Sequence, residues 1–247
     1  MSFDNLNNLS NLNALGSSGG TQFSAGSFGT LMFWVSDISG VYTDLGVTPA
    51  TNGQTIQQWN DLSGKGNHLI QNTAGSRPTY TTNSQNGLPG ITCNNKQLSK
   101  AFTWAQPGHI FMVWKQTEAY NTGRRITDGG TDLSCMFRNT FPSTPATPLE
   151  LYAGSLGGAR NSFTNGTTYV MDYLFSGAAS FIRINNDSRA TTGNPGAGDL
   201  AGFSVGGSIA GAAGVNSVVY EIMGFNNNIG DASATTIINY LRSKWGV

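Results

Sequence analysis

The sequence predicts an all-β fold, and both its composition and its short, regularly interrupted apolar runs support this prediction. Glycine accounts for 33 of the 247 residues, nearly twice the usual share of about 7%. Strong helix formers are scarce, since glutamate occurs only three times and lysine only five times. Apolar, β-prone runs alternate with turn-forming residues, as in many short strands joined by tight turns. A chain of this length is ordinary for one such domain.

The expected strands begin at residue 30 and recur up to residue 227. Residues 109–116 are apolar on both faces, which is typical of a central strand. In the last strand, Glu221 shares a face with Val219, whereas Tyr220 lies on the other face. Two of the runs flank a Gly-Ala-Ala segment and are expected to form a hairpin. The strands predicted in this way are 30–36, 109–116, 168–176, 180–185, 202–208 and 217–227.

One helix is expected, at the end of the chain. Asp231 is a good N-cap residue, because its carboxylate can accept a hydrogen bond from a free backbone N–H group. Ile237, Leu241 and Trp245 then recur at every fourth position and form one apolar stripe. Gly246 stands where a helix commonly ends in a left-handed residue. The sequence therefore predicts a short amphipathic helix after the strands.

Residues 1–27 differ in composition from the rest and are expected to form an arm, separate from one domain at 28–247. Four leucines recur every third residue among asparagines, and the Gly/Ser segment 16–20 follows as a flexible joint. A free tail of this composition is expected to be disordered. Burying the leucines against another subunit would order the arm, so we expect a homo-oligomer. The predicted docking residues are Leu6, Leu9, Leu12 and Leu15.

The charge and the cysteines restrict the partners and the compartment. The formal net charge is zero and only 11% of the residues are charged, so no basic surface is available for nucleic acid or for an anionic membrane. The longest apolar runs are too short to span a bilayer, and the first ten residues lack the basic and apolar segments of a secretion signal. Cys93 and Cys135 can pair once; without a secretion signal, two free, buried thiols are favoured.

The turn at residues 59–68 (WNDLSGKGNH) concentrates polar residues that could hold an ion. Its spacing lacks both the Gly-x-x-x-x-Gly-Lys-Ser/Thr of a phosphate loop and the final glutamate of an EF-hand loop. A weaker calcium site at the oxygens of Asp61, Ser63 and Asn67 stays open as an alternative. The favoured interpretation is a structural turn, in which Asp61 and Ser63 accept local N–H groups, Gly64 and Gly66 take positive φ and Asn67 closes the turn. No cofactor is therefore expected.

The residues needed for hydrolysis are not grouped in the sequence. Glycosidases usually use two carboxylates about 5–10 Å apart, but the three glutamates are far apart and Glu221 has no acidic neighbour at position 219 or 223. His68 and His109 stand away from any Gly-x-Ser-x-Gly segment, so both are interpreted as structural or surface residues. We therefore expect no enzyme activity. Trp104, the one tryptophan in a loop-like segment, is the candidate for stacking on a sugar ring.

Several short motifs occur together in a characteristic order. They are the turn W-x-D-x-S-G-x-G-N at 59–67, R-P-x-Y at 77–80, N-G-x-P at 86–89, Glu221 in the last strand, Asp231 in the loop after it and Y-L-x-x-K-W-G at 240–246. In this order they resemble the concanavalin A-like (LamG-like) jelly-roll domains of phage virion proteins and bacterial surface proteins. The resemblance covers about residues 30–247. It implies two antiparallel sheets packed face to face, with a short C-terminal helix and, here, an N-terminal extended arm, but it does not imply one activity.

Together with the arm and the missing secretion signal, the resemblance favours a non-enzymatic phage virion structural protein. Such a protein would display the jelly roll as a capsid decoration protein, a head fibre or a tail component of a virion assembled in the host cytoplasm. Its arm would contact other virion proteins, and its jelly roll would bind host surface glycans weakly. The alternatives are a bacterial carbohydrate-binding module and, third, a glycoside hydrolase.

Overall fold

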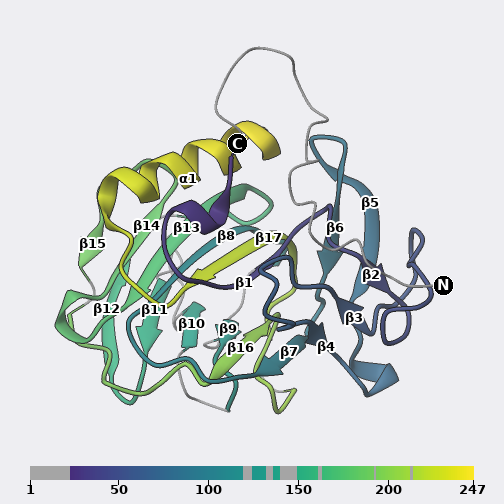
Figure 1. Ribbon diagram of the computed structural model, residues 1–247, viewed down its shortest axis with the longest axis horizontal. Helices are drawn as coiled ribbons and strands as arrows, with labels where there is room; N and C mark the ends of the chain where they lie inside the picture. The colour runs from purple at the N-terminus through teal and green to yellow at the C-terminus, as the bar shows by residue number, and fades with distance from the viewer. Residues whose placement is uncertain are drawn as a thin grey trace.

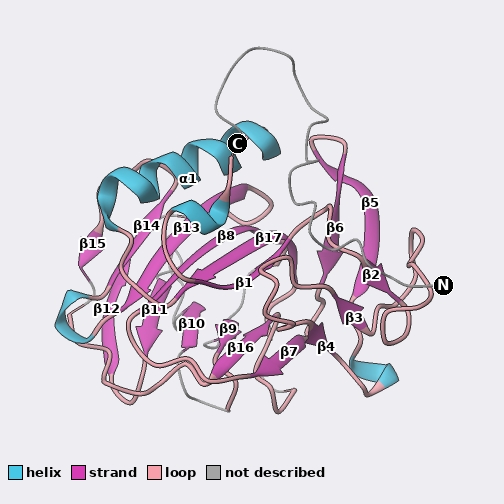
Figure 2. Ribbon diagram, viewed as in Figure 1, coloured by secondary structure: helices cyan, strands magenta, loops and turns pink. Residues whose placement is uncertain are grey.

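The computed structural model describes residues 23–118, 124–131, 136–139, 149–160, 163–191, 193–211 and 214–247. In this part of the chain most regular structure is strand, arranged as two antiparallel sheets packed face to face, with one α-helix outside them (Figure 1, Figure 2). The predicted all-β jelly-roll sandwich with a C-terminal helix is confirmed. Four docking leucines and one cysteine lie outside the described residues: Leu6, Leu9, Leu12, Leu15 and Cys135.

The first sheet contains eight of the described strands. Seven follow one another in the order β15 (Ala190–Thr191), β14 (Phe181–Ile184), β13 (Thr168–Phe175), β8 (Gly108–Gln116), β17 (Ser217–Phe225), β6 (Leu88–Thr92) and β5 (Thr79–Gln85), and β1 (Leu31–Val35) also pairs with β17. β8 pairs with β13 on one side and with β17 on the other, and all of its residues except Lys115 are buried. This confirms the predicted central strand. β13 and β14 form the predicted hairpin.

The second sheet contains nine of the described strands and lies across the core from the first. Their order is β12 (Leu156–Arg160), β11 (Leu149–Tyr152), β10 (Met136–Asn139), β9 (Arg124–Asp128), β16 (Gly202–Val205), β7 (Leu98–Ala101), β4 (Leu69–Ile70), β3 (Gln58–Trp59) and β2 (Val41–Tyr42). Among the described residues, three short 3₁₀ helices lie in connecting segments: η2 (Ala25–Ser27), η3 (Ala74–Ser76) and η4 (Gly177–Ala179). Strands this short, separated by turns, are what the glycine-rich composition predicts.

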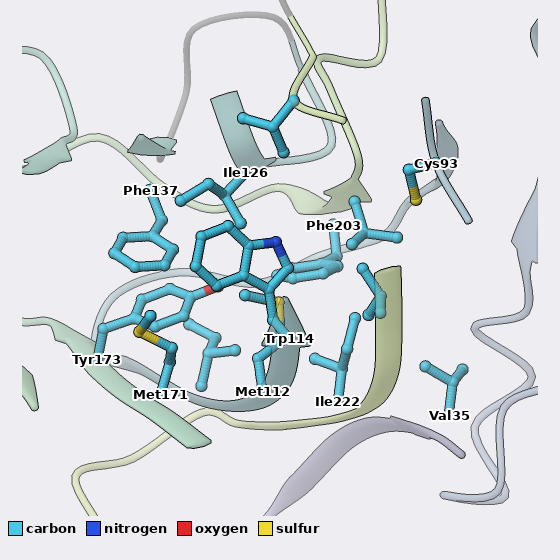
Figure 3. Close-up of a cluster of buried hydrophobic side chains, with 14 of the residues drawn as sticks. Val35, Cys93, Met112, Trp114, Ile126, Phe137, Met171, Tyr173, Phe203 and Ile222 are labelled. Atoms are coloured by element: carbon cyan, nitrogen blue, oxygen red, sulfur yellow. The ribbon is translucent and has the colours of Figure 1, made fainter. Parts of the chain in front are cut away.

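The main hydrophobic core fills the space between the two sheets (Figure 3). Trp114 and Ile222 reach it from the first sheet, and Phe137 and Phe203 reach it from the second. Phe137 stacks on Tyr173, with ring centroids 4.4 Å apart. Each fully buried side chain of this size stabilises the fold by about 1.5–3 kcal/mol relative to leaving it exposed. The interlocking aromatic rings therefore fix how the sheets face one another.

Cys93 lies in this core as a free, fully buried thiol, as predicted for it. Burial raises the pKa of its thiol to about 12, and a hydrogen bond with Ser217 opposes the rise only in part. The thiol therefore stays protonated at neutral pH. Since the thiolate is the reactive form of cysteine, Cys93 is expected to be inert and to act as a small apolar side chain.

Helix α1 (Gly230–Trp245) covers the outer face of the first sheet (Figure 1). Ile237, Leu241 and Trp245 are fully buried against that face, which confirms the predicted stripe. The helix ends at Gly246, whose φ of 67° is left-handed, also as predicted. Within the described residues, no helix combines the length and the hydropathy that a membrane crossing requires.

The beginning of α1 differs from the prediction. The N-cap residue is Ile229 rather than Asp231, which lies inside the first turn. There Asp231 pairs with Arg189, with 2.8 Å between Oδ1 and Nε. A carboxylate in the first turn still interacts favourably with the helix dipole. The sequence signal was thus correct for the region of the helix start and wrong by two residues for the cap itself.

Candidate functional site

The polar turn at residues 59–68 is built around the carboxylate of Asp61. Its Oδ1 accepts the backbone N–H groups of Trp34 (2.9 Å) and Ser63 (2.8 Å). Its Oδ2 accepts the hydroxyl of Ser63 (2.7 Å) and the N–H group of Asn67 (2.9 Å). The N–H group of Asp61 itself donates to Nδ1 of His68 (3.0 Å). Because Trp34 belongs to β1, the carboxylate also fastens the turn to the first sheet.

These bonds argue against the alternative of a calcium site at Asp61, Ser63 and Asn67. Calcium takes about six to eight oxygen ligands, whereas each oxygen of Asp61 already accepts two hydrogen bonds, and the side chain of Asn67 donates to a backbone carbonyl of β1. Gly64 (φ 80°) and Gly66 (φ 71°) adopt positive φ, as the structural interpretation predicts. In the part of the chain that the structure describes, no three acidic, histidine or cysteine side chains gather in a metal-binding group.

Trp104 is not available to stack on a sugar, which corrects the prediction made for it. Only 2% of this residue is exposed. Its ring stacks on Phe102, with centroids 5.7 Å apart, and meets the edge of Phe33 at 5.8 Å. The segment that looks like a loop in the sequence therefore folds its tryptophan into the main core. An aromatic cluster of Phe33, Phe102, Trp104 and Phe203 fills that end of the sandwich.

His109 belongs to a buried polar network under α1. Its Nε2 lies 2.5 Å from Oδ1 of Asp172, and Arg183 donates from Nε to the other oxygen of that carboxylate (2.8 Å). The N–H group of Ile229 donates to Nδ1 of His109 (3.4 Å), so the ring proton is on Nε2 and points to Asp172. His109 and Asp172 are fully buried. The network ties β8, β13 and β14 together and agrees with a structural role for His109.

A break in the first sheet forms the candidate site. Along one edge, β17 pairs first with β6, up to Val219, and then with β1, from Ile222 onward. Tyr220 and Glu221 lie between these two pairings and have no strand partner on that edge among the described residues. We call this opening the β1/β6 gap (Figure 1). The residues that follow β1 and the middle of β6 form its two sides.

A small pocket opens at the β1/β6 gap. Its cavity volume is only about 10 Å³, about what one water molecule needs, within about 170 Å³ of surrounding space that includes open solvent. Sites for larger ligands commonly enclose about 300–1,000 Å³. A methyl group on Gly90 would lie 2.8 Å from the ring of Tyr220, so the absence of a side chain at Gly90 lets that ring lie close to the pocket wall. The walls are mostly aromatic and aliphatic. The lining residues are Ser36, Asp37, Val41, Trp59, Tyr80, Pro89, Gly90, Ile91 and Tyr220.

Beside the pocket, Lys244 bridges two carboxylates. Its Nζ lies 2.5 Å from Oδ1 of Asp37 and 2.8 Å from Oε2 of Glu221. Glu221 also accepts the indole N–H groups of Trp34 (2.8 Å) and Trp245 (2.9 Å). One buried carboxylate thus connects β17 to β1 and to the last turn of α1. The motif residues noted in the sequence, Glu221 and Lys244, converge here as a brace between the helix and the sheet.

The charges of this cluster stabilise one another. Burial raises the pKa of Glu221, and the neighbouring positive charge of Lys244 and the hydrogen bonds only partly offset this rise. Burial opposes the charge on Lys244, but the negative charges of Glu221 and of other acids nearby outweigh this effect and raise its pKa. Lys244 is therefore firmly protonated at neutral pH.

Asp37 and Tyr80 provide the accessible polar groups of the pocket. The side chain of Asp37 is 10% exposed, and in the described chain Lys244 is its one ion-pair partner. Burial raises the pKa of Tyr80, and the negative charge of Asp37 adds to the rise, so the two groups act on each other electrostatically. Tyr80 is half-buried. The pocket therefore combines a carboxylate and a phenol with an apolar floor.

Two carboxylates do come close at this site, although the sequence separates them widely. Asp37 and Glu221 contact the same Nζ, so their nearest oxygens are at most about 5.3 Å apart, the two contact distances taken together. That separation is near the one used by retaining glycosidases. Glu221, however, is fully buried and its oxygens are occupied by two indole groups and Lys244. Only Asp37 is placed to meet a ligand.

The sequence did not single out Asp37, Tyr80 or Tyr220 as site residues. A usable signal for Asp37 was its position directly after a buried strand, where an acid often lies at the edge of a sheet. Tyr80 stands within the R-P-x-Y motif noted above. For Tyr220 there was no local signal, because its role depends on the break between β1 and β6, which are far from it in the chain.

Comparison with solved structures shows the fold. The chain superposes on a sialidase of Trypanosoma rangeli in complex with sialic acid, with a TM-score of 0.58 and 11% sequence identity. The match covers 91% of this chain but only 34% of the sialidase. Domain 4 of AbnA, a GH43 extracellular arabinanase from Geobacillus stearothermophilus in complex with arabinotriose, gives a TM-score of 0.58 and 12% identity. That match covers 85% of this chain and 98% of the domain.

A third similar structure is a GH54 α-L-arabinofuranosidase soaked with a cyclic sulfate inhibitor, with a TM-score of 0.59 and 13% identity. It covers 89% of this chain and 60% of that protein. No family model and no curated protein sequence matches the chain. At these identities the likeness shows a β-sandwich fold and no more.

The comparison overturns the expectation of a phage virion structural protein. The similar solved structures reported above are glycoside hydrolases or a domain of one, and none of them is a virion component. The virion expectation depended on the family resemblance and on the Leu/Asn-rich arm. The four leucines of that arm lie outside the described residues. The alternative of a carbohydrate-binding module agrees better with these findings.

Proposed function

We propose that this protein is a non-catalytic carbohydrate-binding module with a concanavalin A-like (LamG-like) sandwich, and that the partly exposed rim of the β1/β6 gap contacts the sugar. The comparison that supports this most is the arabinanase domain, because it matches as a separate module over 98% of its length and is in complex with arabinotriose. The other two neighbours are matched over smaller shares of larger enzymes. A module of this size fits a binding role within or beside such enzymes.

The chemistry of the pocket is the observation on which the proposal depends. A sugar presents apolar C–H groups on its faces and hydroxyl groups around its edge, so it needs aromatic or aliphatic walls and a few well-placed polar groups. Val41, Tyr80 and Pro89 are the partly exposed aliphatic and aromatic residues of the lining, whereas Trp59, Tyr220 and Ile91 are at most 2% exposed and lie beneath them. Asp37 offers an acceptor for hydroxyl groups, and the phenol of Tyr80 both donates and accepts. Such a small site implies weak binding, with a Kd of the order of 1 mM for one unit.

The absence of catalysis is part of the proposal. Hydrolysis by a carboxylate pair requires both groups to reach the glycosidic bond, one as acid and one as base or nucleophile. Glu221 is held behind the pocket by Trp34, Trp245 and Lys244. We expect no release of reducing sugar when the protein is incubated with a polysaccharide that it binds.

A calorimetric titration with arabinotriose, xylotriose, cellotriose and maltotriose tests the proposal. We expect at least one trisaccharide to bind, and Tyr80→Ala to weaken that binding about tenfold through loss of a wall and a hydroxyl group. Tyr152→Ala is the matched control, because Tyr152 is a partly exposed tyrosine on β11 of the second sheet. Binding that survives Tyr80→Ala unchanged would remove the site. If no trisaccharide binds, the function itself is refuted.

A further inference from the structure

We propose that the leucine-bearing segment 6–15 docks on its own domain, against the loop at residues 43–48 that follows β2. We call this loop the β2 loop. Residues 5–15 contain four leucines and no charged side chain, so an exposed apolar surface is the partner that they fit. The docking does not depend on the proposed function, because it joins two parts of one chain and involves no sugar.

Exposed apolar side chains gather around β2. In the part of the chain that the structure describes, four large hydrophobic side chains are exposed, and three of them, Ile38, Leu45 and Val47, lie within ten residues of one another. Leu45 is 59% exposed and Val47 is 80% exposed. Single exposed apolar side chains are ordinary, whereas grouped ones mark surfaces that contact another segment or molecule. The stretch around β2 is therefore a candidate docking surface.

The β2 loop holds two of these side chains in place before any partner binds. Oδ1 of Asp44 accepts the N–H groups of Val47 (2.8 Å) and Thr48 (2.9 Å). Gly46 has a φ of 90°, which permits the tight turn between Leu45 and Val47. A loop that is already ordered loses little conformational entropy on binding, so more of the apolar contact energy stabilises the docked state.

The described part of the chain begins close to this surface. The ring of Phe23 stacks on Tyr240, with centroids 3.7 Å apart. Nζ of Lys244 lies 5.8 Å from the centroid of Tyr240 and 2.5 Å from Oδ1 of Asp37. The centroid of Phe23 is therefore at most about 12 Å from Asp37, the three distances taken together. Ile38, the first of the exposed apolar residues, directly follows Asp37.

The segment is long enough to reach the β2 loop. Leu15 stands eight residues before Phe23, and eight extended residues span up to about 28 Å. Val41 lines the same pocket as Asp37, and the β2 loop begins two residues after Val41. Since the segment belongs to the same chain, its effective concentration at this surface is of the order of 1 mM. Docking within one chain is thus favoured over docking between dilute copies.

Methyl NMR spectroscopy of the full chain tests the contact. We expect nuclear Overhauser effects between leucine methyl groups of the segment and the methyl groups of Val47. They should be lost in a variant that carries serine in place of all four leucines of the segment. The variant Leu45→Ser should weaken those that remain at Val47. Leu156 is the internal control, because it is 56% exposed but lies on β12 of the second sheet, and it should show no such effect.

A matched variant separates the leucines from the rest of the segment. It carries serine in place of four asparagines and should keep every effect at Val47, because the leucines are unchanged. Thermal unfolding of each variant reports whether the domain is folded. The asparagines to be replaced are Asn7, Asn8, Asn11 and Asn13.

Three results would overturn the inference. The first is the absence of these effects at Val47 in the unaltered chain. The second is effects that appear only between labelled and unlabelled chains in a mixed sample, which would show that the segment docks on a second copy. The third is effects of equal strength at Leu156 and Val47, which would show unspecific apolar contact. None of these results bears on sugar binding, so the proposed function is tested separately.

Discussion

At the scale of single residues, the carboxylates of this protein are used in two different ways. Asp61 is saturated by local donors and shapes a turn, whereas Asp37 keeps acceptor capacity at the rim of a pocket. Both are polar residues in short loops of the sequence, but only Asp37 comes after an apolar run. The difference becomes visible only when the partners are known, because it depends on how many N–H and O–H groups reach each carboxylate.

Asp61→Ala is expected to lower the free energy of unfolding by about 3 kcal/mol. The change leaves the N–H groups of Trp34, Ser63 and Asn67 without their acceptor, and each buried unpaired donor costs about 1–3 kcal/mol. Urea denaturation measures the effect. Lys65→Ala is the control in the same turn; Lys65 is exposed, and its loss should change stability by less than about 0.5 kcal/mol.

Thermal unfolding decides the question of calcium at this turn. We expect the melting temperature of the unaltered protein to be the same with added calcium and with a chelator, because the oxygens of Asp61 are used by hydrogen bonds. Stabilisation by calcium that disappears in Asp61→Ala would show that an ion, rather than the amides, organises the turn.

At the scale of elements, the C-terminal helix is joined to the sheet by polar as well as apolar contacts. Its apolar stripe and its glycine end were predictable, because both follow from spacing within one short segment. The brace at its last turn was not predictable as a contact, since Glu221, Lys244 and Asp37 come from three separate elements. The sequence motifs contained two of these residues without indicating that they meet.

Alkaline pH should loosen this end of the helix. Burial, together with the charge of Glu221, raises the pKa of Tyr240 to about 12 from its ordinary value of 10.0. Since the folded state favours the neutral phenol, its contribution is complete below pH 10.0 and is lost as the pH rises toward about 12. Lys244, whose pKa is also raised, loses its contribution in the same direction above 10.5. The loss for Tyr240 alone is about 2 kcal/mol at the upper end of this range.

Urea denaturation at a series of pH values checks this expectation. Stability should be level between neutral pH and about pH 9, where the contribution of the neutral Cys93 thiol begins to be lost, and should fall further above about pH 10 as the contributions of Tyr240 and Lys244 are lost. Tyr240→Phe keeps the ring that stacks on Phe23, with centroids 3.7 Å apart, but removes the titrating group. Its profile should therefore fall less steeply. An equal fall in both proteins would show that Tyr240 does not contribute to the pH dependence.

At the scale of the whole molecule, composition and periodicity were enough to predict an all-β fold with one terminal helix, and the resemblance implied that its strands form a sandwich. They were not enough to find the site. Trp104 was judged exposed because its neighbours look like a loop, but Phe33, Phe102 and Phe203 come together around it in space. Such a cluster depends on contacts between distant strands, which local patterns do not record.

The β1/β6 gap could not be predicted from local sequence patterns either. It exists because β17 changes its pairing partner between Val219 and Ile222, and those partners begin near residues 31 and 88. No window of sequence contains all three strands. The function was also misjudged at this scale, since the arm suggested assembly, while the fold of the domain matches parts of carbohydrate-active enzymes.

The most direct test of the account is where on the molecule a sugar binds. Titrating the ¹⁵N-labelled protein with the tightest-binding neutral trisaccharide and following its amide resonances gives this location. We expect the largest shifts at residues 36–41, 79–81, 90–91 and 220–221, around the β1/β6 gap, with little change on the second sheet beyond β3. Shifts concentrated on β9–β12, or binding with no change at residues 36–41 and 79–81, would contradict the account.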